Sequence, residues 1–383
     1  MTSPREVVVV GARVAGSATA MLLARMGHDV VMIDRVEPTS DTLSTHALMR
    51  TAVLQLERWG ILDDIIDEGT PPIRRVTLGF GDQRLSFGFR SEYGVDALYA
   101  PRRSVLDTVM LRAALAAGVE FRNGVRALDV TRGDSGRVDG VITESSGSTS
   151  TIAARHVIGA DGARSRIATA VGAEAYRSHR ALNTVIYGYF DGVEGDGYEF
   201  QFTPGCSAGL IPTNDGLTNV FAAYPRDAHG GDTEAIFDHV LEAASSDLSE
   251  RVRAGSRVER FRRGSIPGFV RVPGGPGWAL VGDSGFTKDP ISAHGISDAF
   301  RDAELVAAAV HRSLLDPRSE TSAMIHYQTT RDRFALPVFD HSEALATYTW
   351  DEAEASTRLR ALSDITDDEC RHLVGLAPVQ HAA

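Results

Sequence analysis

The chain has 383 residues, of which 43% are hydrophobic and 23% are charged, and its formal net charge is −12. This composition is typical of a globular protein that is long enough for two packed lobes. The acidic excess argues against a general nucleic-acid surface, which needs a basic face, although local arginines can still bind small phosphates.

The two cysteines, Cys206 and Cys370, lie far apart and outside any zinc-binding or redox spacing. No apolar run approaches the ~20 residues of a membrane span, and the early run at 7–10 lacks a basic leader and a cleavage site. We therefore expect a cytoplasmic protein without a membrane span or a structural metal site.

The N-terminal region predicts a strand, a glycine turn and a helix. Residues 6–10 indicate a buried parallel strand, Gly11 to Gly16 form the turn, and small and apolar residues at 17–26 indicate a helix. A second strand at 30–33 ends at Asp34, where an acid can bind a ribose hydroxyl. This βαβ unit is typical of binding to an ADP moiety.

Arg13 occupies the place where the dinucleotide pattern has its second glycine. By itself, the turn therefore fits any parallel βαβ unit as well as a nucleotide site. A guanidinium group at this place can also reach a phosphate oxygen.

The next segments predict two helices that carry arginines near their start. A polar loop at 35–46 precedes a helix with Arg50 in its first turn, and alternating runs at 76–80 and 85–89 indicate a β excursion. Arg103 begins the second helix, where its charge opposes the helix dipole. A bound anion and a solvated surface explain this arginine equally well.

The middle of the chain is predicted to be rich in strands. Strands at 125–131, 137–143 and 156–158 precede a glycine turn that contains Asp161. Alternating, aromatic-rich segments at 181–224 indicate an antiparallel β lobe, and the pattern at 232–254 indicates one amphipathic helix. Several of the lobe's aromatic residues are candidates for ligand contact, namely Tyr187, Tyr189, Phe200, Phe202 and Phe221.

Residues 279–310 predict a strand, a long loop and a helix. Asp283 lies at the strand end, and the helix that begins near Gly295 presents free amides and a positive dipole end, which favour a negative charge. Lys288, the single lysine of the chain, and Asp289 precede Pro290, where an ordinary surface ion pair is one reading. Beyond residue 315 we expect helices at 321–334, 339–348 and 351–362, the first two separated by Pro337.

The joint order of the three glycine-rich turns, over residues 6–315, resembles the FAD-dependent monooxygenases typified by para-hydroxybenzoate hydroxylase. The resemblance implies an α/β fold, with a Rossmann-like FAD-binding domain, a β-sheet substrate lobe and C-terminal helices. We expect the FAD-binding domain at 1–75, 100–180 and 265–315. The substrate domain is expected at 76–99 and 181–264, and a helical segment at 316–383.

The resemblance also implies roles for single residues. Asp34 would bind the adenosine ribose, Asp283 a ribityl hydroxyl, and the amides of Gly295 and Ile296 would face flavin N1 and O2. Arg50 and Arg103 would approach the pyrophosphate or the ribityl chain. The full predicted FAD-binding set is Gly11, Arg13, Gly16, Asp34, Arg35, Arg50, Arg103, Val125, Asp161, Asp283, Pro290, Gly295 and Ile296.

His46, Pro290 and His294 are the candidates for catalytic contact with substrate or cofactor, because they lie beside the predicted flavin-binding segments. For each histidine, a hydrogen-bonded loop role carries the greater weight.

The resemblance implies a monooxygenase that uses NAD(P)H and O2 and hydroxylates or epoxidises a small-to-medium, aromatic or polyketide-like substrate through a flavin C4a-hydroperoxide. A separate flavin reductase as partner stays open. The alternatives are a FAD-dependent reductase or dehydrogenase of the geranylgeranyl-reductase type and a flavin-binding protein without turnover. A halogenase is disfavoured, because Lys288 and the three tryptophans do not match that family's motifs.

Overall fold

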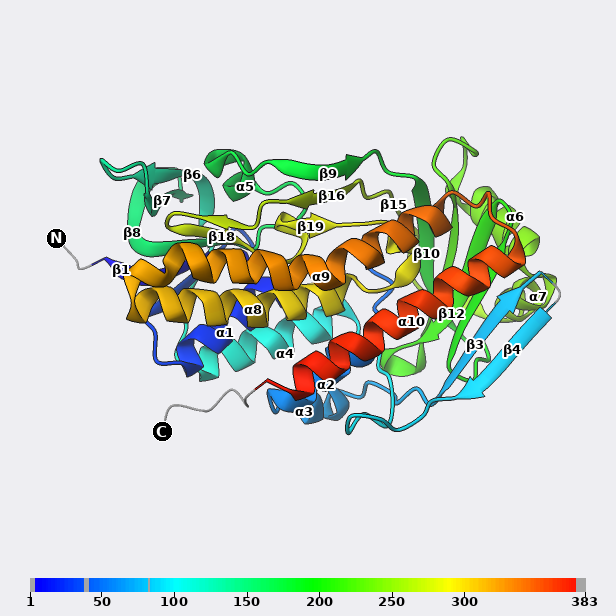
Figure 1. The fold of residues 1–383 in the computed structure, drawn as a ribbon. Coiled ribbons are helices and arrows are strands. Elements are labelled where there is room, and N and C mark those ends of the chain that lie inside the picture. Colours follow the sequence, from blue (N-terminus) through cyan, green and yellow to red (C-terminus); the bar gives the residue numbers. More distant parts are fainter. Residues whose placement is uncertain (1–3, 38–40, 82, 377–383) are drawn as a thin grey trace.

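A computed structural model describes residues 4–37, 41–81 and 83–376 of the chain. Figure 1 shows strands gathered at both ends of an elongated molecule and long helices crossing it from one end to the other. The helices are α1 (Val14–Arg25), α2 (Arg50–Arg58), α3 (Leu62–Asp67), α4 (Arg103–Ala116), α5 (Arg166–Val171), α6 (Thr233–Ala244), α7 (Ser246–Ala254), α8 (Gly295–Leu315), α9 (Glu320–Ala346) and α10 (Glu352–Val374).

The first sheet is built on the predicted N-terminal βαβ unit. Its order is β17 (Gly274–Gly275), β18 (Trp278–Leu280), β8 (Ser148–Gly159), β1 (Arg5–Val10), β2 (Val30–Asp34) and β5 (Glu120–Asn123), and β7 (Val138–Ser145) joins β8 to β6 (Arg126–Arg132). β1 pairs in parallel with both β2 and β8. The parallel centre of the sheet confirms the α/β class predicted from the sequence.

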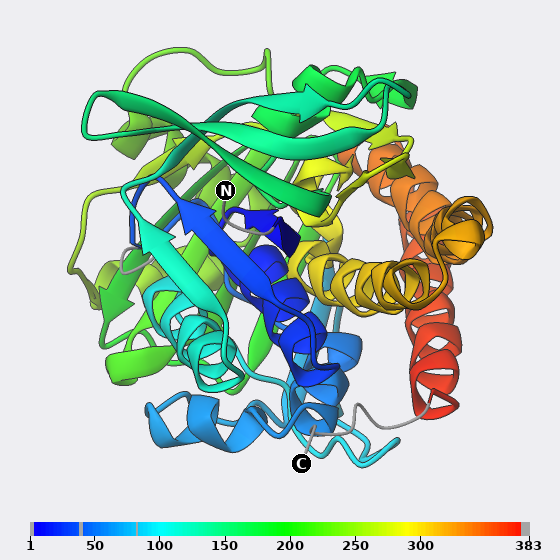
Figure 2. The same cartoon turned by 90° about the vertical axis from the view of Figure 1, so that its left-hand side faces the viewer.

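The valines of β1 are buried on both faces of this sheet. Val7 and Val9 pack in one core with α1 and α8, whereas Val8 and Val10 pack in a second core with residues of β6, β7 and α5. Figure 2 shows this arrangement end-on, with α1 and α8 on one side of the sheet and the β6–β8 ribbon on the other. Burial on both faces explains why this strand is a continuous apolar run.

The second sheet forms the predicted β lobe. Its order is β14 (Ser256–Arg257), β10 (Asn183–Asp191), β13 (Thr218–Pro225), β12 (Cys206–Pro212), β11 (Tyr198–Thr203), β3 (Arg75–Phe80) and β4 (Gln83–Gly88), and β15 (Arg262–Gly264) pairs with β10. The excursion at 76–89 is confirmed, because it extends this sheet next to β11. A third sheet, of β19 (Phe286–Thr287), β16 (Gly268–Arg271) and β9 (Ala175–His179), lies between the two ends of the molecule (Figure 1).

The helix expected at 232–254 is two helices, so that expectation was wrong. Ser245 lies between them in extended backbone, with φ of −167° and ψ of 116°, and its hydroxyl accepts a hydrogen bond from Leu248 N. Serine side chains compete with helical backbone hydrogen bonds and favour the N-cap position. The local capping preference of Ser245 therefore overrides the apolar periodicity on either side.

The break expected at Pro337 was also wrong, because α9 runs without interruption from Glu320 to Ala346. Proline removes one backbone hydrogen bond from a helix interior, at a cost of about 3 kcal/mol. Ala335 and Val338 on either side of it are buried, and burial of this helix offsets the lost bond. α10 likewise extends beyond the expected residue 362 and packs against α9 and α2. Within the described ranges, no helix has the length and apolarity needed to cross a membrane.

Candidate functional site

A large hollow opens where the carboxyl ends of β1, β2 and β8 meet the loop before α2 and the start of α8. The space within it, including the part open to solvent, is ≈ 2430 Å³. The predicted residues that line it are Gly11, Arg13, Asp34, Arg35, His46, Arg103, Val125, Asp161, Asp283, Pro290, Gly295 and Ile296. Segments far apart in the sequence are thus brought to one site.

Three predicted residues lie elsewhere. Gly16 is buried in α1 behind the lining of the hollow. Arg50 is stacked over the Phe89 ring and donates to the Arg90 carbonyl oxygen at 2.9 Å. The ring of His294 points into the protein interior. For Arg50, contact with a cofactor stays a prediction that this geometry does not favour.

The glycine turn at the floor of the hollow allows two very close backbone approaches. Gly11 has φ of 110°, and a Cβ atom there would lie 2.3 Å from the Ala160 carbonyl oxygen. A Cβ atom on Gly16 would lie 1.8 Å from the carbonyl oxygen of Gly11. Glycine is therefore required at both positions, and it lets the N-terminus of α1 reach the hollow.

Asp34 both shapes the hollow and lines it. Its Oδ2 accepts a hydrogen bond from Ala12 N at 2.8 Å, and its Oδ1 accepts one from Val36 N at 3.1 Å. Val125 lies beside it, and its N–H donates to the Asp34 carbonyl oxygen at 2.9 Å. The carboxylate therefore fixes the end of β2 against the glycine turn, in the place that a ribose-binding acid occupies in such folds.

Asp107 organises two of the predicted arginines. It is fully buried, accepts from Arg13 Nη1 at 2.8 Å and from Arg103 Nη2 at 2.8 Å, and also accepts from Val14 N. The charge of Arg103 at the start of α4 is thus balanced within the protein, by a residue one turn later in the same helix. Asp107 was not among the residues predicted from the sequence, although its i, i+4 spacing from Arg103 indicates such a pair.

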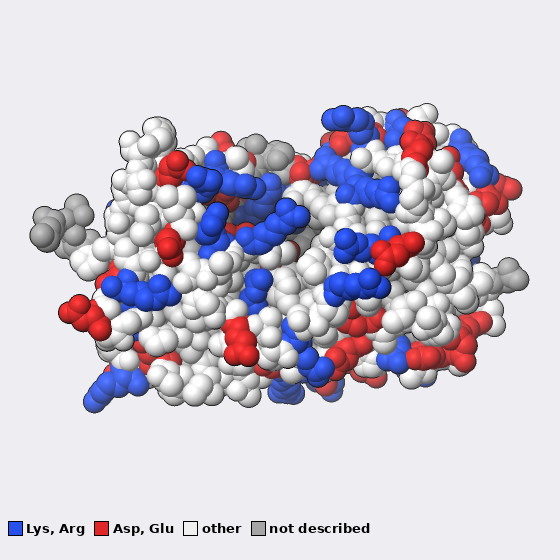
Figure 3. Space-filling view, turned by 90° about the horizontal axis from the view of Figure 1, so that it is seen from above, with Lys and Arg blue, Asp and Glu red and all other residues white. Residues whose placement is uncertain are grey.

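Arginines surround the hollow, although the chain as a whole is acidic. Arg35, Arg126, Arg164 and Arg166 line it, and Figure 3 shows basic side chains gathered around a depression in this face. A basic rim of this kind attracts phosphate groups. The last three were not predicted to have a role, although Arg164 and Arg166 directly follow the Asp161 turn.

Asp161 itself fixes the start of α5. Its Oδ2 accepts from Arg166 N at 2.6 Å, and its Oδ1 accepts from the Ser165 hydroxyl at 2.5 Å. Burial nevertheless raises the pKa of Asp161 above its ordinary value. The hydrogen bonds from Ser165 and Arg166 hold Asp161 in position on the wall of the hollow.

The start of α8 faces the far end of the hollow. Gly295 and Ile296 form its first turn, where N–H groups lack intrahelical partners. Asp283 lies nearby with its side chain open to the hollow, and the surrounding protein desolvates it, which raises its pKa. This end of the hollow therefore combines free amides, a positive helix dipole and a carboxyl group.

Lys288 adds a buried cation at this end. It pairs with Asp298 of α8 rather than with its neighbour Asp289, and its side chain is 4% exposed, so the expected surface ion pair was wrong. Burial favours a higher pKa for Asp298, but Lys288 and Arg301 lower it below its ordinary value. The reason is the fold: residues 288 and 298 lie on either side of the turn that begins α8, and they meet there out of solvent.

His46 lines the hollow and joins the tyrosines of β10. Its Nε2 hydrogen-bonds to the hydroxyl of Tyr189, whereas its Nδ1 is buried without a hydrogen-bond partner among the described residues. Burial lowers the pKa of His46 to about 3, so the ring is neutral at pH 7. Tyr187 donates to the Thr42 carbonyl oxygen at 3.0 Å. Both tyrosines thus anchor the loop before α2.

His294 lies behind the wall of the hollow. Its Nδ1 is 2.5 Å from the Ser292 carbonyl oxygen, and its Nε2 is 3.0 Å from the Thr366 hydroxyl of α10. Burial lowers its pKa to about 4. These contacts fit the favoured interpretation of His294 as a hydrogen-bonded loop histidine, and α10 supplies one of its partners.

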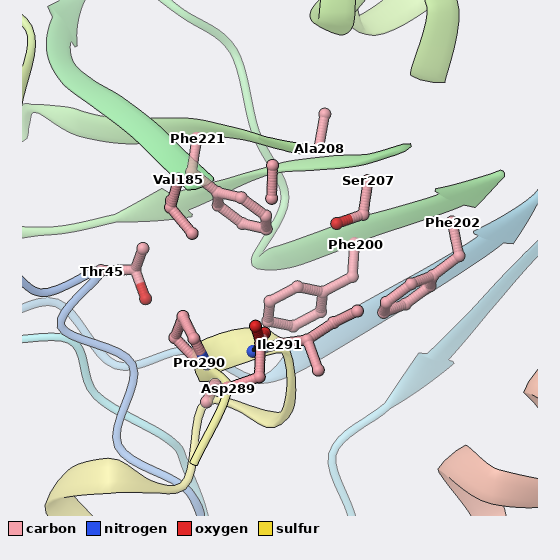
Figure 4. A pocket seen from close by; sticks show the side chains of 12 residues that line it. Thr45, Val185, Phe200, Phe202, Ser207, Ala208, Phe221, Asp289, Pro290 and Ile291 are labelled. Carbon is pink, nitrogen blue, oxygen red and sulfur yellow. Dashed lines mark hydrogen bonds between the residues drawn. The ribbon is translucent and has the colours of Figure 1, made fainter. Parts of the chain in front are cut away.

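A smaller space, which we call the apolar chamber, adjoins the hollow on the side of the β lobe. It encloses ≈ 440 Å³, including the part open to solvent. Figure 4 shows its lining residues, and the larger apolar ones among them are Val185, Phe200, Phe202, Phe221, Pro290 and Ile291. It shares four lining residues with the hollow, namely Thr45, Asp289, Pro290 and Ala293. The predicted candidates Phe200, Phe202 and Phe221 are therefore grouped at one place.

Comparison with known proteins connects this geometry to a cofactor. The family model described as "FAD binding domain" matches residues 5–342. Menaquinone reductase of Mycolicibacterium smegmatis is 28% identical over 325 residues, which are 80% of this chain and 76% of that protein. Kynurenine 3-monooxygenase of Salinispora tropica is 28% identical over 336 residues, which are 79% and 72% of the two chains. A triple mutant of the flavin-dependent brominase Bmp2 shares the fold, with a TM-score of 0.83 at 18% identity over 97% of this chain and 94% of that one.

The residues of the hollow fit FAD. The glycine turn leaves room for a pyrophosphate at the N-terminus of α1, the arginine rim supplies positive charge, and the free amides of α8 suit an electron-rich ring. As an enzyme, the protein is a FAD-dependent oxidoreductase. The chain belongs to the FAD binding domain family, which confirms its resemblance to the FAD-dependent monooxygenases.

Proposed function

We propose that this protein is an NAD(P)H-using FAD monooxygenase that places one oxygen atom of O2 into a small or medium-sized, largely apolar organic substrate. The observation that carries the proposal is the apolar chamber, which adjoins the hollow at Pro290 and is lined by Phe200 and Phe221. An apolar site next to a cofactor site is suited to hold a substrate away from bulk water.

The proposed reaction balances as follows. NAD(P)H supplies two electrons, one oxygen atom enters a C–H or C=C bond of the substrate, and the second oxygen atom leaves as water after taking up protons. FAD supplies the electron transfer and the activation of O2 when it is bound. The protein binds, orients and shields the reactants.

The lining residues have separate proposed roles. We assign the arginine rim and the glycine turn to the pyrophosphate, Asp34 to the adenosine ribose and Asp283 to the ribityl chain. The amides of Gly295 and Ile296, together with Lys288, would stabilise negative charge at the start of α8 without reorganisation. Pro290 separates the hollow from the chamber and would help to exclude water.

The same assignment divides the chain into functional parts. Residues 1–75, 100–180 and 265–315 would bind FAD, and residues 76–99 and 181–264 would bind substrate. The helices of 316–383 would cover both parts. Residues 1–3, 38–40, 82 and 377–383 of this division lie outside the described residues.

A FAD-dependent reductase is the second candidate, because the relative from Mycolicibacterium smegmatis is a menaquinone reductase. Such an enzyme would use the same hollow but would transfer electrons to an organic acceptor and leave O2 out of its product. A protein that takes electrons from a separate flavin reductase, instead of from NAD(P)H, is a variant of the first candidate.

The discriminating experiment is turnover of the FAD-loaded protein with NADH or NADPH under isotopically labelled O2, with phenol and indole as small aromatic probes. The proposal predicts products that contain one labelled oxygen atom. Consumption of NAD(P)H that requires a quinone acceptor and leaves both probes unlabelled would support the reductase instead.

A further inference from the structure

Asp289 is the carboxylate that lies where the apolar chamber meets the hollow. Its side chain is 1% exposed, and its two oxygens have different surroundings. One of them, Oδ1, accepts hydrogen bonds from Asn183 Nδ2 and from Ile291 N, each at 3.1 Å. The other, Oδ2, is buried without a hydrogen-bond partner among the described residues. A buried polar atom of this kind is costly and calls for a partner that the protein does not supply.

No direct salt bridge balances Asp289 within the described ranges. The adjacent Lys288 is paired with Asp298. A second acid lies close by, because the backbone N–H of Asp289 donates to Glu343 Oε1 at 3.1 Å. Glu343 in turn pairs with His179. Asp289 lines the chamber (Figure 4), and the hydrogen-bonding capacity of its carboxyl group is partly unused.

The protonation state of Asp289 determines which ligand groups its Oδ2 atom can bind. Burial raises its pKa to about 7, and the neighbouring Glu343 acts in the same direction. Because Oδ1 already accepts two N–H groups, the neutral acid carries its proton on Oδ2 and donates from there. The ionised form accepts at the same atom. A ligand hydroxyl satisfies both forms, and a ligand N–H satisfies the ionised one.

The remaining wall offers mostly apolar contacts to such a ligand. Figure 4 shows Phe200, Phe221, Pro290 and Ile291 around the space into which Asp289 projects. The hydroxyl of Ser207, which also lines the chamber, is already hydrogen-bonded to Tyr348 at 2.7 Å. An apolar body with one polar group next to Asp289 therefore matches this lining.

We propose that Asp289 determines the specificity of the apolar chamber by binding, through Oδ2, the hydroxyl or N–H group of an otherwise apolar ligand. This rests on the proposed function, since it takes the chamber as the substrate site. Asp289 thereby orients the ligand against the hollow. A site built to hydrogen-bond a polar group discriminates strongly against analogues that lack it.

The test is calorimetric titration of the oxidised, FAD-loaded protein without any electron donor. The probes are two matched pairs, phenol with anisole and indole with N-methylindole. In each pair only the first member can donate to Asp289. The expected result is binding of phenol and indole roughly tenfold tighter than of their methylated partners.

Three variants locate the preference. Asp289→Leu should abolish it, and Asp289→Asn should reduce it while keeping the oxygen that accepts from Asn183 and Ile291. Val185→Ala is the matched control on the same wall, and it should weaken both members of each pair alike. If Asp289→Leu fails to fold, Asp289→Asn is decisive. The ratio of its affinities for phenol and anisole should be at least threefold smaller than that of the wild type.

Equal affinities within both pairs in the wild type would overturn the proposal, as would a full preference in the folded Asp289→Leu variant. Absence of binding by all four probes would also overturn it, because the chamber would then not be a small-ligand site. None of these titrations involves oxygen transfer. A failed monooxygenase assignment with an intact phenol preference would therefore leave this proposal standing.

Discussion

Replacing Asp289 by Asn should stabilise the protein increasingly as the pH rises. The carboxyl pKa is raised by burial from 3.8 to about 7. The folded state therefore holds a proton that the unfolded state releases, and wild-type stability falls as the pH rises from about 4 to about 7. Asparagine keeps an oxygen for the two hydrogen bonds of Oδ1 and has no proton to release.

The magnitude follows from the size of the shift. Each pH unit within this window changes the free energy of unfolding by about 1.4 kcal/mol. The variant should thus exceed the wild type by about 2 kcal/mol near pH 5 and by about 4 kcal/mol near pH 8. Below about pH 4 the two proteins should have the same free energy of unfolding, apart from a constant offset for the exchange of the carboxyl group for an amide.

The assay is urea unfolding at a series of pH values, with excess FAD held constant. Glu343→Gln, alone and combined with Asp289→Asn, separates the contribution of the neighbouring acid, whose pKa burial also raises. A difference between Asp289→Asn and wild type that stays constant between about pH 5 and pH 8 would refute the reasoning, since Asp289 would then titrate alike in both states.

Other perturbations test the cofactor site. Asp34→Asn should weaken FAD binding roughly tenfold, measured by fluorescence titration, because it removes charge from a ribose-binding position; unchanged affinity would remove Asp34 from the site. Gly11→Ala should prevent folding with FAD, since its Cβ would overlap the Ala160 carbonyl group; a yellow, folded variant would contradict this. Lys288→Met should make the flavin midpoint potential more negative by roughly 20–60 mV, with Lys288→Arg as the charge-keeping control; equal potentials in all three proteins would exclude the electrostatic role. His294→Gln should cost roughly 1–3 kcal/mol of stability and leave turnover of the folded enzyme unchanged; a large fall in kcat at normal stability would restore a catalytic role.

Much of the fold was predictable because local patterns and tertiary structure agree. The apolar run of β1, the turn at Gly11 and the acid at Asp34 all favour the same βαβ unit, and they lie in the fold as expected. A fold can be predicted from its sequence where local patterns and tertiary packing favour the same structure. The helix break at Ser245 and the unbroken helix at Pro337 were missed, because capping in one case and packing in the other decided against the general pattern.

The site was predictable as a set of positions and less so as a set of partners. Most of the predicted FAD-binding residues line the hollow, because each follows a strand end or begins a helix. The pairing of Lys288 with Asp298, and of Arg13 and Arg103 with Asp107, depends on how distant segments pack. The unpartnered Oδ2 of Asp289 could not be predicted from the sequence either, because burial and hydrogen-bond partners also depend on how distant segments pack.

The central claim, that reduced FAD in this protein activates O2 for transfer to a ligand in the chamber, is tested most directly by rapid mixing. Reduced, FAD-loaded protein is mixed with O2 in the presence of phenol or indole, and the visible absorption is followed. The account predicts a transient spectrum that belongs to neither reduced nor oxidised flavin, followed by a hydroxylated product. A single-step return to oxidised flavin with every probe, and no oxygenated product, would contradict it.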